Sequence, residues 1–259
     1  MGSHNNVDRF RQRMLDGKIC VGTGIALTDP LSSEIAAEAG NDFVWIEMEH
    51  SHIDNSQLIG HIMAVRGTNA AALVRVSWND PVILKPVVDM CPAGVIVPMI
   101  RSADEALKAV QACRYPPEGS RGFGPIRSMY GFASMEAYLE AAAEQVMVFV
   151  QIEHIDAVDD LDNIVQVPGL DGLVIGRNDL SGSMGKLGQH ADPEVQAAID
   201  KVFVAVQGTG LFVGCSVGYD LSVVDAWWPK GCHFFSIGGD TDYFAELAAE
   251  VARKVHAYD

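Results

Sequence analysis

Four ionisable residues lie at or near the ends of apolar runs that have the length of β-strands. Glu153 ends the run VMVFVQIE and Asp179 ends GLVIGRND, while His50 ends FVWIEMEH and Arg75 lies near the end of AALVRV. A helix-like stretch follows each run. If the runs are parallel strands of one closed barrel, their ends lie on one rim and the four side chains converge on a pocket. That arrangement is typical of an enzyme built on a barrel.

Glu153 and Asp179 are the first candidates for metal chemistry. They are 26 positions apart, which is the length of one strand–helix unit. Hard divalent cations such as Mg²⁺ prefer one or two carboxylates together with water and substrate oxygens. The alternative is that both acids cap the helices that follow them, as acids at helix starts often do.

Arg75 interrupts an otherwise apolar strand, so burial of its guanidinium requires an anion. A substrate carboxylate, an oxo group or an enolate oxygen would serve as that anion. A structural salt bridge to Glu47 or Asp89 is the alternative.

His50 lies in the segment EMEHSH, beside Glu47 and Glu49. A neighbouring carboxylate can fix the imidazole tautomer and raise its basicity, as a general base requires. For His52 we favour a role as a hydrogen-bond donor in the loop. A zinc site built from these two histidines and an acid is disfavoured, because no further ligand with suitable spacing follows.

The elements that must position these residues alternate along the chain. Runs rich in Val and Ile predict strands near Cys20–Ala26, Asp42–Met48, Ala71–Val76, Gly94–Met99, Val146–Glu153, Gly172–Gly176, Leu211–Ser216 and His233–Ile237. Amphipathic stretches predict helices at Asn6–Asp16, Leu31–Ala39, Ser56–Arg66, Pro81–Met90, Ala103–Arg114, Met135–Glu144, Ala157–Val165, Pro193–Gln207, Leu221–Trp228 and Asp242–Tyr258. Asp80, Ser102 and Asp192 are the expected helix caps.

Eight evenly spaced strand–helix units favour a single (β/α)8 TIM barrel domain over residues 1–259 rather than a doubly wound sheet. Two segments depart from this regular alternation of strands and helices. Tyr115–Ser134 is long for a connector; its arginines Arg121 and Arg127 could close over an anion, or the loop could be mobile. Arg177–Ala191 is the second. The turn Gly238-Gly239-Asp240 could offer amides to a phosphate, but we favour a tight turn.

Composition excludes some classes of function. The chain has 34 acidic and 18 basic residues and a formal net charge of −16, which argues against nucleic acid and anionic membrane surfaces. No apolar run approaches the roughly 18 residues of a membrane span. The start has no signal-peptide core, and Met1–His4 resembles an expression remnant. Five cysteines without a CxxC motif suit buried thiols in the cytoplasm.

Several long segments together carry a resemblance to a known family. WIEMEHSHID, VRVSWNDP, AGVIVPMIRSADEA, ACRYPPEGSRGFGP and VQIEHIDAVDDLDNIVQVPGLDGLVIGRNDLSGSMG resemble the class II pyruvate aldolases of the aldolase/citrate lyase family. The nearest members are the 4-hydroxy-2-oxoheptanedioate aldolases and the 2-keto-3-deoxy sugar-acid aldolases. The resemblance runs from about Gly22 to Gly239, nearly the whole chain.

The resemblance implies a (β/α)8 barrel that exchanges its C-terminal helix, 242–258, within a homohexamer made of two trimers. It implies a divalent ion, Mg²⁺, Mn²⁺ or Co²⁺, held by Glu153 and Asp179, and a catalytic set of Arg75 and a His50–Asp89 acid/base dyad. The substrate-binding residues that it implies are Arg75, Gln151, Gly176, Asn178, Asp179 and Phe212, with Glu47, Glu49, Phe123 and Arg177 as further candidates.

Three departures from the family pattern concern the substrate pocket. Glu47 stands where Asp is usual, and Arg177-Asn178 stand where Pro-Ala usually precedes the metal-binding aspartate. Ser51-His52-Ile53 replaces the more usual Ala-Pro-Asn. The extra cation and the altered loops are expected to change acceptor preference or even the reaction.

We therefore predict a cytoplasmic metal-dependent lyase that cleaves a 4-hydroxy-2-oxo acid to pyruvate, or a hydroxypyruvate-like donor, and an aldehyde. No lysine ends a strand, which is consistent with a mechanism that has no Schiff base. One alternative is a lyase acting on a CoA ester of the malyl-CoA or citramalyl-CoA type. A barrel that binds an oxo acid without turning it over is the other.

Overall fold

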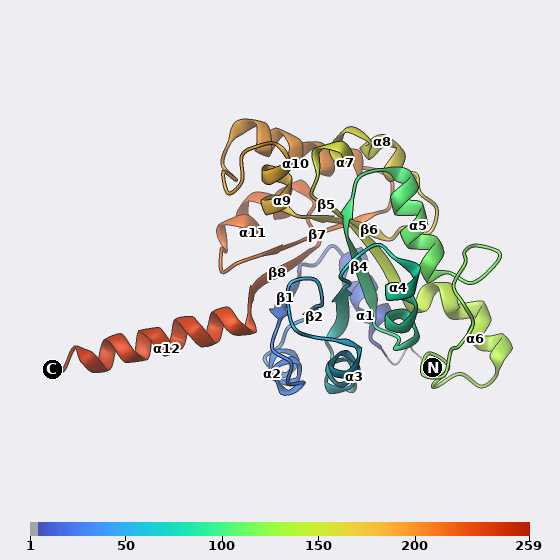
Figure 1. The fold of residues 1–259 in the computed structure, drawn as a ribbon, viewed down its shortest axis with the longest axis horizontal. Coiled ribbons are helices and arrows are strands. Elements are labelled where there is room, and N and C mark those ends of the chain that lie inside the picture. Colours follow the sequence, from blue (N-terminus) through green and yellow to red (C-terminus); the bar gives the residue numbers. More distant parts are fainter. Residues whose placement is uncertain (1–4) are drawn as a thin grey trace.

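The computed structural model describes residues 5–259, and the predicted remnant at Met1–His4 lies outside that range. Its strands are β1 (Cys20–Ile25), β2 (Phe43–Glu47), β3 (Ala71–Arg75), β4 (Gly94–Ile100), β5 (Met147–Ile152), β6 (Gly172–Ile175), β7 (Phe212–Val217) and β8 (Phe234–Gly239). Each strand pairs in parallel with the next, and β8 pairs with β1 to close the barrel. The predicted (β/α)8 barrel is confirmed (Figure 1).

Helices surround this barrel. They are α1 (Val7–Leu15), α2 (Leu31–Glu38), α3 (Asn55–Ala64), α4 (Pro81–Asp89), α5 (Ala103–Cys113), α6 (Met135–Ala141), α7 (Ile155–Asp159), α8 (Leu161–Ile164), α9 (Arg177–Ser183), α10 (Pro193–Ala205), α11 (Ser222–Trp227) and α12 (Asp240–His256), with 3₁₀ turns at Ala142–Gln145 and Trp228–Lys230. The caps predicted at Asp80, Ser102 and Asp192 are confirmed, since each side chain accepts a backbone N–H of its helix.

Most predicted elements are found within a few residues of their bounds, but one predicted helix is divided. The stretch Ala157–Val165 forms α7 and α8, which meet at Asp160 in a non-helical conformation with φ −103° and ψ 11°. The Asp160 carboxylate accepts the backbone N–H of Ala103 at 2.7 Å. The break therefore coincides with a contact between neighbouring strand–helix units. The segment Arg177–Ala191 contains α9, and α12 begins at Asp240 instead of Asp242.

The barrel interior is filled at its amino-terminal end by aromatic side chains. Helix α1 covers this end, and the ring of Phe10 packs edge-on against Phe43 and Phe234 at centroid distances of 5.5 and 5.7 Å. Gly214 leaves room for this cluster, because a Cβ there would lie 2.1 Å from the Phe234 ring. The interior is therefore a packed core and not a channel.

Toward the carboxyl ends of the strands the interior becomes polar. Side chains two positions apart on a strand face the same side, so Glu47 lies above Trp45 on β2 and Arg75 above Leu73 on β3. Gln151 follows Phe149 in the same way on β5. Glu47 and Arg75 are direct neighbours in the β2–β3 register. The polar layer over an apolar core is the floor of a pocket.

The long connector at residues 115–134 lies at the opposite end of the barrel. Arg121 forms an ion pair with Asp89 at 2.7 Å, and Arg127 donates a hydrogen bond to the carbonyl of Met90. Both partners lie where α4 ends, just before the amino-terminal end of β4. These contacts tie the connector to the lower rim of its own barrel, far from the polar layer.

Helix α12 extends away from the barrel (Figure 1). Within the described range, none of its side chains is buried, and the apolar residues Phe244, Leu247, Val251 and Val255 are all more than half exposed. They recur at helical spacing and form one apolar stripe. No helix among residues 5–259 is long and apolar enough to cross a bilayer.

Candidate active site

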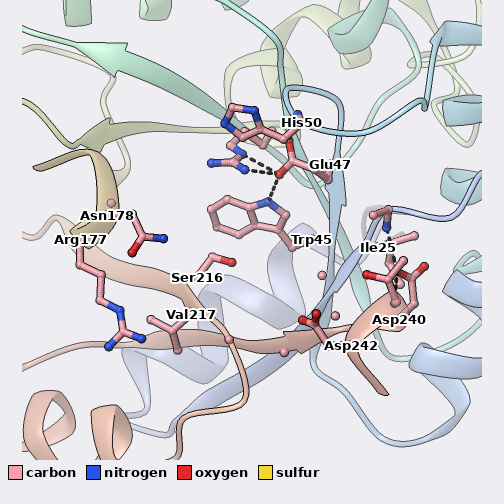
Figure 2. Close-up of a pocket in the computed structure, with 18 of the residues that line it drawn as sticks. Ile25, Trp45, Glu47, His50, Arg177, Asn178, Ser216, Val217, Asp240 and Asp242 are labelled. Atoms are coloured by element: carbon pink, nitrogen blue, oxygen red, sulfur yellow. Dashed lines mark hydrogen bonds and ion pairs between the residues drawn. The ribbon is translucent and has the colours of Figure 1, made fainter. Parts of the chain in front are cut away.

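A cavity of about 500 Å³ opens at the carboxyl ends of the strands (Figure 2). Of the residues singled out from the sequence, it brings together Glu47, His50, Arg75, Gln151, Gly176, Arg177, Asn178 and Asp179. Glu49 and Glu153 lie at the same end, directly beneath or beside these side chains, and their contacts are described below. The four strand ends that were predicted to converge do so.

Glu47 connects the end of β2 with the end of β3. Its Oε2 atom accepts hydrogen bonds from the Nε of Arg75 at 2.6 Å and from the indole N–H of Trp45 at 3.1 Å. Its Oε1 atom accepts the backbone N–H groups of Glu49 and His50 at 2.7 and 3.0 Å. Because every contact fixes a neighbouring group, Glu47 holds both the arginine and the loop that carries the histidine.

Arg75 is held by two carboxylates. Its Nη2 lies 2.6 Å from Glu47 Oε2, and its Nη1 lies 3.2 Å from Glu49 Oε2. Its guanidinium also lies 5.6 Å from the centroid of the Trp45 ring. The salt bridge to Glu47 that was the structural alternative for Arg75 is therefore present. Arg75 nonetheless lines the cavity, so the guanidinium N–H groups that Glu47 and Glu49 do not use remain available to an anion there.

His50 lies at the mouth of the cavity. Its side chain is 68% exposed, and its Nε2 atom is 3.8 Å from Glu49 Oε2. Burial raises the pKa of the Glu49 carboxyl, while the charges of Arg75 and His50 oppose that rise. The histidine is accessible to a substrate and has an acid beside it, as general acid/base chemistry requires.

Glu153 is the most strongly perturbed acid of the site. The residue is 2% exposed, its Oε1 accepts the backbone N–H of Met99 at 2.6 Å, and its Oε2 accepts Gln151 Nε2 at 2.5 Å. Burial, with a further contribution from the charges of Glu49 and Asp179, raises the pKa of Glu153 to about 7. The carboxylates of Glu49, Glu153 and Asp179 therefore lie in one region together with Arg75, which already forms ion pairs with Glu47 and Glu49.

The packing around Glu153 depends on a glycine. A Cβ at Gly176 would lie 2.5 Å from Glu153 Oε2 and 2.8 Å from Gln151 Nε2, which is too close for any side chain. Gln151 Oε1 is buried and has no hydrogen-bond partner within the described part of the chain. A buried acceptor without a partner is costly, so this amide oxygen is suited to a bound group.

Asp179 and Asn178 lie in the first turn of α9, exposed to the cavity. Neither Glu153 nor Asp179 caps a helix. The side-chain cap of α7 is His154, and α9 begins without a side-chain cap. Neither side chain therefore acts as a helix cap, although Asp179 still lies in the first turn of α9 and both oxygens of Glu153 accept hydrogen bonds.

Arg177 also lines the cavity, but its charge is paired. Its Nη1 lies 3.2 Å from Asp220 Oδ2, and Figure 2 shows the guanidinium below Asn178, pointing away from Trp45. The extra cation predicted near the substrate carboxylate is thus partly neutralised and displaced from the centre of the cavity.

Three residues are not brought to the cavity within one chain. Asp89 ends α4 at the amino-terminal end of the barrel and binds Arg121, so it cannot pair with His50 of the same chain. Phe123 lies on the connector at that end. Phe212 begins β7, packs against the ring of His233, and belongs to the lower aromatic core. Its side chain faces the barrel interior but lies below the cavity, in the aromatic core.

The sequence reasoning missed several lining residues. Trp45 and Ser216 face the cavity from β2 and β7, and Asp242 reaches it from the first turn of α12, just after the turn at Asp240 that the sequence had singled out. A signal for Ser216 was available, because it is the last inward-facing position of its strand, four residues after Phe212. For Asp242 no strand pattern applies, since it follows the turn after β8.

Comparison with known proteins agrees with this geometry. Residues 24–246 match the profile of the family described as HpcH/HpaI aldolase/citrate lyase. The chain belongs to this family. The matched range contains all eight strand ends that surround the cavity. The resemblance inferred from the sequence motifs is therefore confirmed.

Two curated relatives in the HpcH/HpaI family are similar over nearly their whole length. A hydroxypyruvate/pyruvate aldolase of Pseudomonas aeruginosa is 34% identical over 247 residues, covering 95% of this chain and 92% of the relative. A 4-hydroxy-2-oxo-heptane-1,7-dioate aldolase of Escherichia coli is 34% identical over 249 residues, covering 96% and 95%. A solved family protein from Burkholderia cenocepacia J2315 superposes with a TM-score of 0.88 at 27% identity, covering 96% of this chain and 99% of that one.

Proposed function

We propose that this protein is a divalent-metal-dependent aldolase. It reversibly cleaves a 4-hydroxy-2-oxo acid to pyruvate, or a hydroxypyruvate-like donor, and an aldehyde. The names of the two curated relatives support the reaction class. The single observation that carries the metal requirement is the burial of Glu153 beside Asp179 and Glu49: burial, and to a smaller extent these two like charges, raise the pKa of its carboxyl.

The residues present fit a hard divalent ion. Glu153 and Asp179 supply two carboxylates, the number that Mg²⁺ commonly uses, and the unpartnered Oε1 of Gln151 lies beside them. No group of three or more His, Cys, Asp or Glu side chains within residues 5–259 is arranged to hold a metal. A site with two protein carboxylates leaves positions open for substrate oxygens.

The chemistry follows from where negative charge develops. Cleavage of the C3–C4 bond leaves an electron pair on the pyruvate fragment as an enolate. A Mg²⁺, Mn²⁺ or Co²⁺ ion held by Glu153 and Asp179 would stabilise that charge at the C2 oxygen. Arg75 provides a fixed positive charge at the same place, because Glu47 and Glu49 hold its guanidinium.

His50 is the residue suited to moving a proton. It accepts the proton of the 4-hydroxyl group during cleavage and returns it during condensation. Its backbone N–H is fixed by Glu47, while its exposed ring can reach a substrate at the cavity mouth. The open first turn of α9 would hold the donor carboxylate through the backbone N–H groups near Asn178 and Asp179.

We further propose that the site is completed in a homohexamer made of two trimers. Asp89 and Phe123 lie at the opposite end of their own barrel, so they can contact a His50 only from another chain. The exposed apolar stripe on α12 supports exchange of this helix between chains. A cytoplasmic location is supported by the five cysteines, all free and buried.

Release of pyruvate with and without EDTA tests the proposed function. The substrates are a free 4-hydroxy-2-oxo acid and a CoA ester such as malyl-CoA. Metal-dependent cleavage of the free acid is expected. Cleavage of the CoA ester alone would identify a CoA-ester lyase, and binding of the free acid without release would identify a non-catalytic barrel.

A Mn²⁺ titration tests the metal site independently of turnover. Glu153→Gln should abolish Mn²⁺ binding, because it removes the charge of a buried ligand without changing its shape. Glu140→Gln is the matched control, since Glu140 is an exposed acid on α6. Wild-type affinity in Glu153→Gln would refute the assigned ligand.

A further inference from the structure

One wall of the cavity has no role in the proposed chemistry. It is formed by the ends of β7, β8 and β1 and carries Gly24, Ser216, Gly218, Gly238 and Asp242. In Figure 2 the Trp45 ring lies between Ser216 of this wall and the side chains of Glu47 and His50. We call these five residues the glycine wall. Its small residues leave room for a substrate group beyond the reacting carbons.

The carboxylate of Asp242 on the glycine wall is unpaired. It is exposed in the first turn of α12, and its Oδ2 lies 3.4 Å from the position of a Cβ on Gly239. No residue in the range 5–259 forms a hydrogen bond or ion pair with it. Asp240, two positions earlier, differs: its carboxylate accepts the backbone N–H groups of Ala26 and Leu27 at 3.0 and 3.1 Å.

No cationic side chain among residues 5–259 pairs with Asp242. The two arginines that line the cavity form their ion pairs elsewhere: Arg75 with Glu47 and Glu49, and Arg177 with Asp220. A substrate carboxylate at the glycine wall would therefore lie beside an unpaired acid without a counter-charge. Such like-charge contact disfavours binding of that substrate.

Ser216 offers the glycine wall a neutral partner for substrate. It is the exposed, inward-facing residue near the end of β7, and its hydroxyl forms no hydrogen bond with other described residues. A hydroxyl group can donate to the Asp242 carboxylate and accept a hydrogen bond from the Ser216 hydroxyl. A substrate hydroxyl that lies between the two side chains would thus satisfy both.

We propose that the glycine wall receives the substituent of the acceptor aldehyde, and that Asp242 and Ser216 select an uncharged hydroxyaldehyde over an aldehyde with a distal carboxylate. This inference rests on the proposed aldolase function. It assigns the choice of acceptor aldehyde to Asp242 and Ser216, which have no proposed part in metal binding or proton transfer.

Condensation with pyruvate in the presence of Mn²⁺ tests the proposal. The three acceptors are glycolaldehyde, which has a hydroxyl, succinic semialdehyde, which has a carboxylate, and propanal, which has neither. Wild-type kcat/KM should be about tenfold or more higher for glycolaldehyde than for succinic semialdehyde. Asp242→Asn should shift that ratio about tenfold toward succinic semialdehyde, since the repelling charge is lost.

Ser216→Ala should lower the preference for glycolaldehyde over propanal by about tenfold, because the hydroxyl loses its partner. Glu246→Gln makes the same charge change one turn farther along α12, outside the cavity, and should leave all ratios as in the wild type. If the Asp242→Asn variant does not fold, the dependence of wild-type kcat/KM on salt concentration provides the test in its place. Rising ionic strength should increase kcat/KM for succinic semialdehyde and not for glycolaldehyde.

A wild-type preference for succinic semialdehyde would overturn the proposal. An unchanged ratio in Asp242→Asn would do so too, as would selective loss of succinic semialdehyde turnover in Arg177→Ala. Exchange of the pyruvate methyl protons in D₂O needs no acceptor and reports enolate formation separately. If the pyruvate methyl protons exchange but succinic semialdehyde is the preferred acceptor, only the inference about Asp242 and Ser216 is wrong. If neither proton exchange nor turnover is seen, the proposed aldolase function is wrong as well.

Discussion

Arg75 and Glu47 are neighbours across the β2–β3 pair, and two guanidinium nitrogens of Arg75 lie 2.6 Å from one carboxylate oxygen of Glu47. The same carboxylate holds the backbone of His50. Glu47 thus fixes Arg75 and the backbone of His50, the proposed proton carrier, relative to each other. Preorganisation of this kind is a main source of catalytic rate enhancement.

Arg75→Ala should lower kcat/KM for pyruvate release about a hundred- to a thousandfold, because a fixed charge at the developing enolate is lost. Arg75→Lys should retain part of the activity, since it keeps the charge but loses the planar fork. Steady-state assays on folded variants measure both values. Wild-type turnover in Arg75→Ala would refute the role assigned to this residue.

Gly176→Ala should weaken Mn²⁺ binding by about tenfold or more, although it changes no ligand and no charge. The new methyl group would lie 2.5 Å from Glu153 Oε2 and force that carboxylate to move. Gly182→Ala, in α9, is the control, because its Cβ would meet only the flexible end of Leu187 at 3.3 Å. Equal Mn²⁺ affinity in the two variants would show that Mn²⁺ binding does not depend on the position of the Glu153 carboxylate.

The metal-free protein should lose stability as pH rises. The pKa of Glu153 is raised from 4.5 to about 7 by burial, so the folded state keeps a proton that the unfolded state releases. This stabilisation is complete below pH 4.5 and is lost as pH rises through 7; it amounts to about 3 kcal/mol.

Urea unfolding in EDTA at pH 5 and pH 8 measures that loss. Glu153→Gln cannot titrate, so its unfolding free energy should change less between the two pH values. An equal change in both proteins would contradict the assignment to Glu153. Excess Mn²⁺ should reduce the loss in the wild type, because a bound cation favours the charged carboxylate.

The double variant Leu247→Asp/Val251→Asp should reduce the size of the assembly. Both side chains lie on the exposed apolar stripe of α12, and a charge on each would oppose burial against another chain. Ala249→Asp adds a carboxylate to another face of the same helix and is the control. Light scattering after size-exclusion chromatography measures the mass. An unchanged mass in the double variant would separate α12 from the interface.

The sequence by itself determined the barrel and the charged residues at the carboxyl ends of its strands. Parallel strands covered on both faces must be apolar along their whole length, so a charged residue at the end of such a run marks the point where the chain leaves the core. Glu153, Arg75 and His50 were found in this way. Long family motifs then related these residue types to a reaction class.

Only the tertiary structure decided how deep in the barrel each side chain lies, which end of the barrel it reaches and which residues it contacts. Phe212 and Ser216 face inward from the same strand, but closure of the barrel places the first in the aromatic core and the second in the cavity. Asp89 follows Arg75 by 14 residues, and α4 carries it to the opposite end of the barrel. The chain position of Asp242 after a turn gave no sign that it reaches the cavity. These outcomes depend on contacts between distant segments, which the local pattern of residues does not encode.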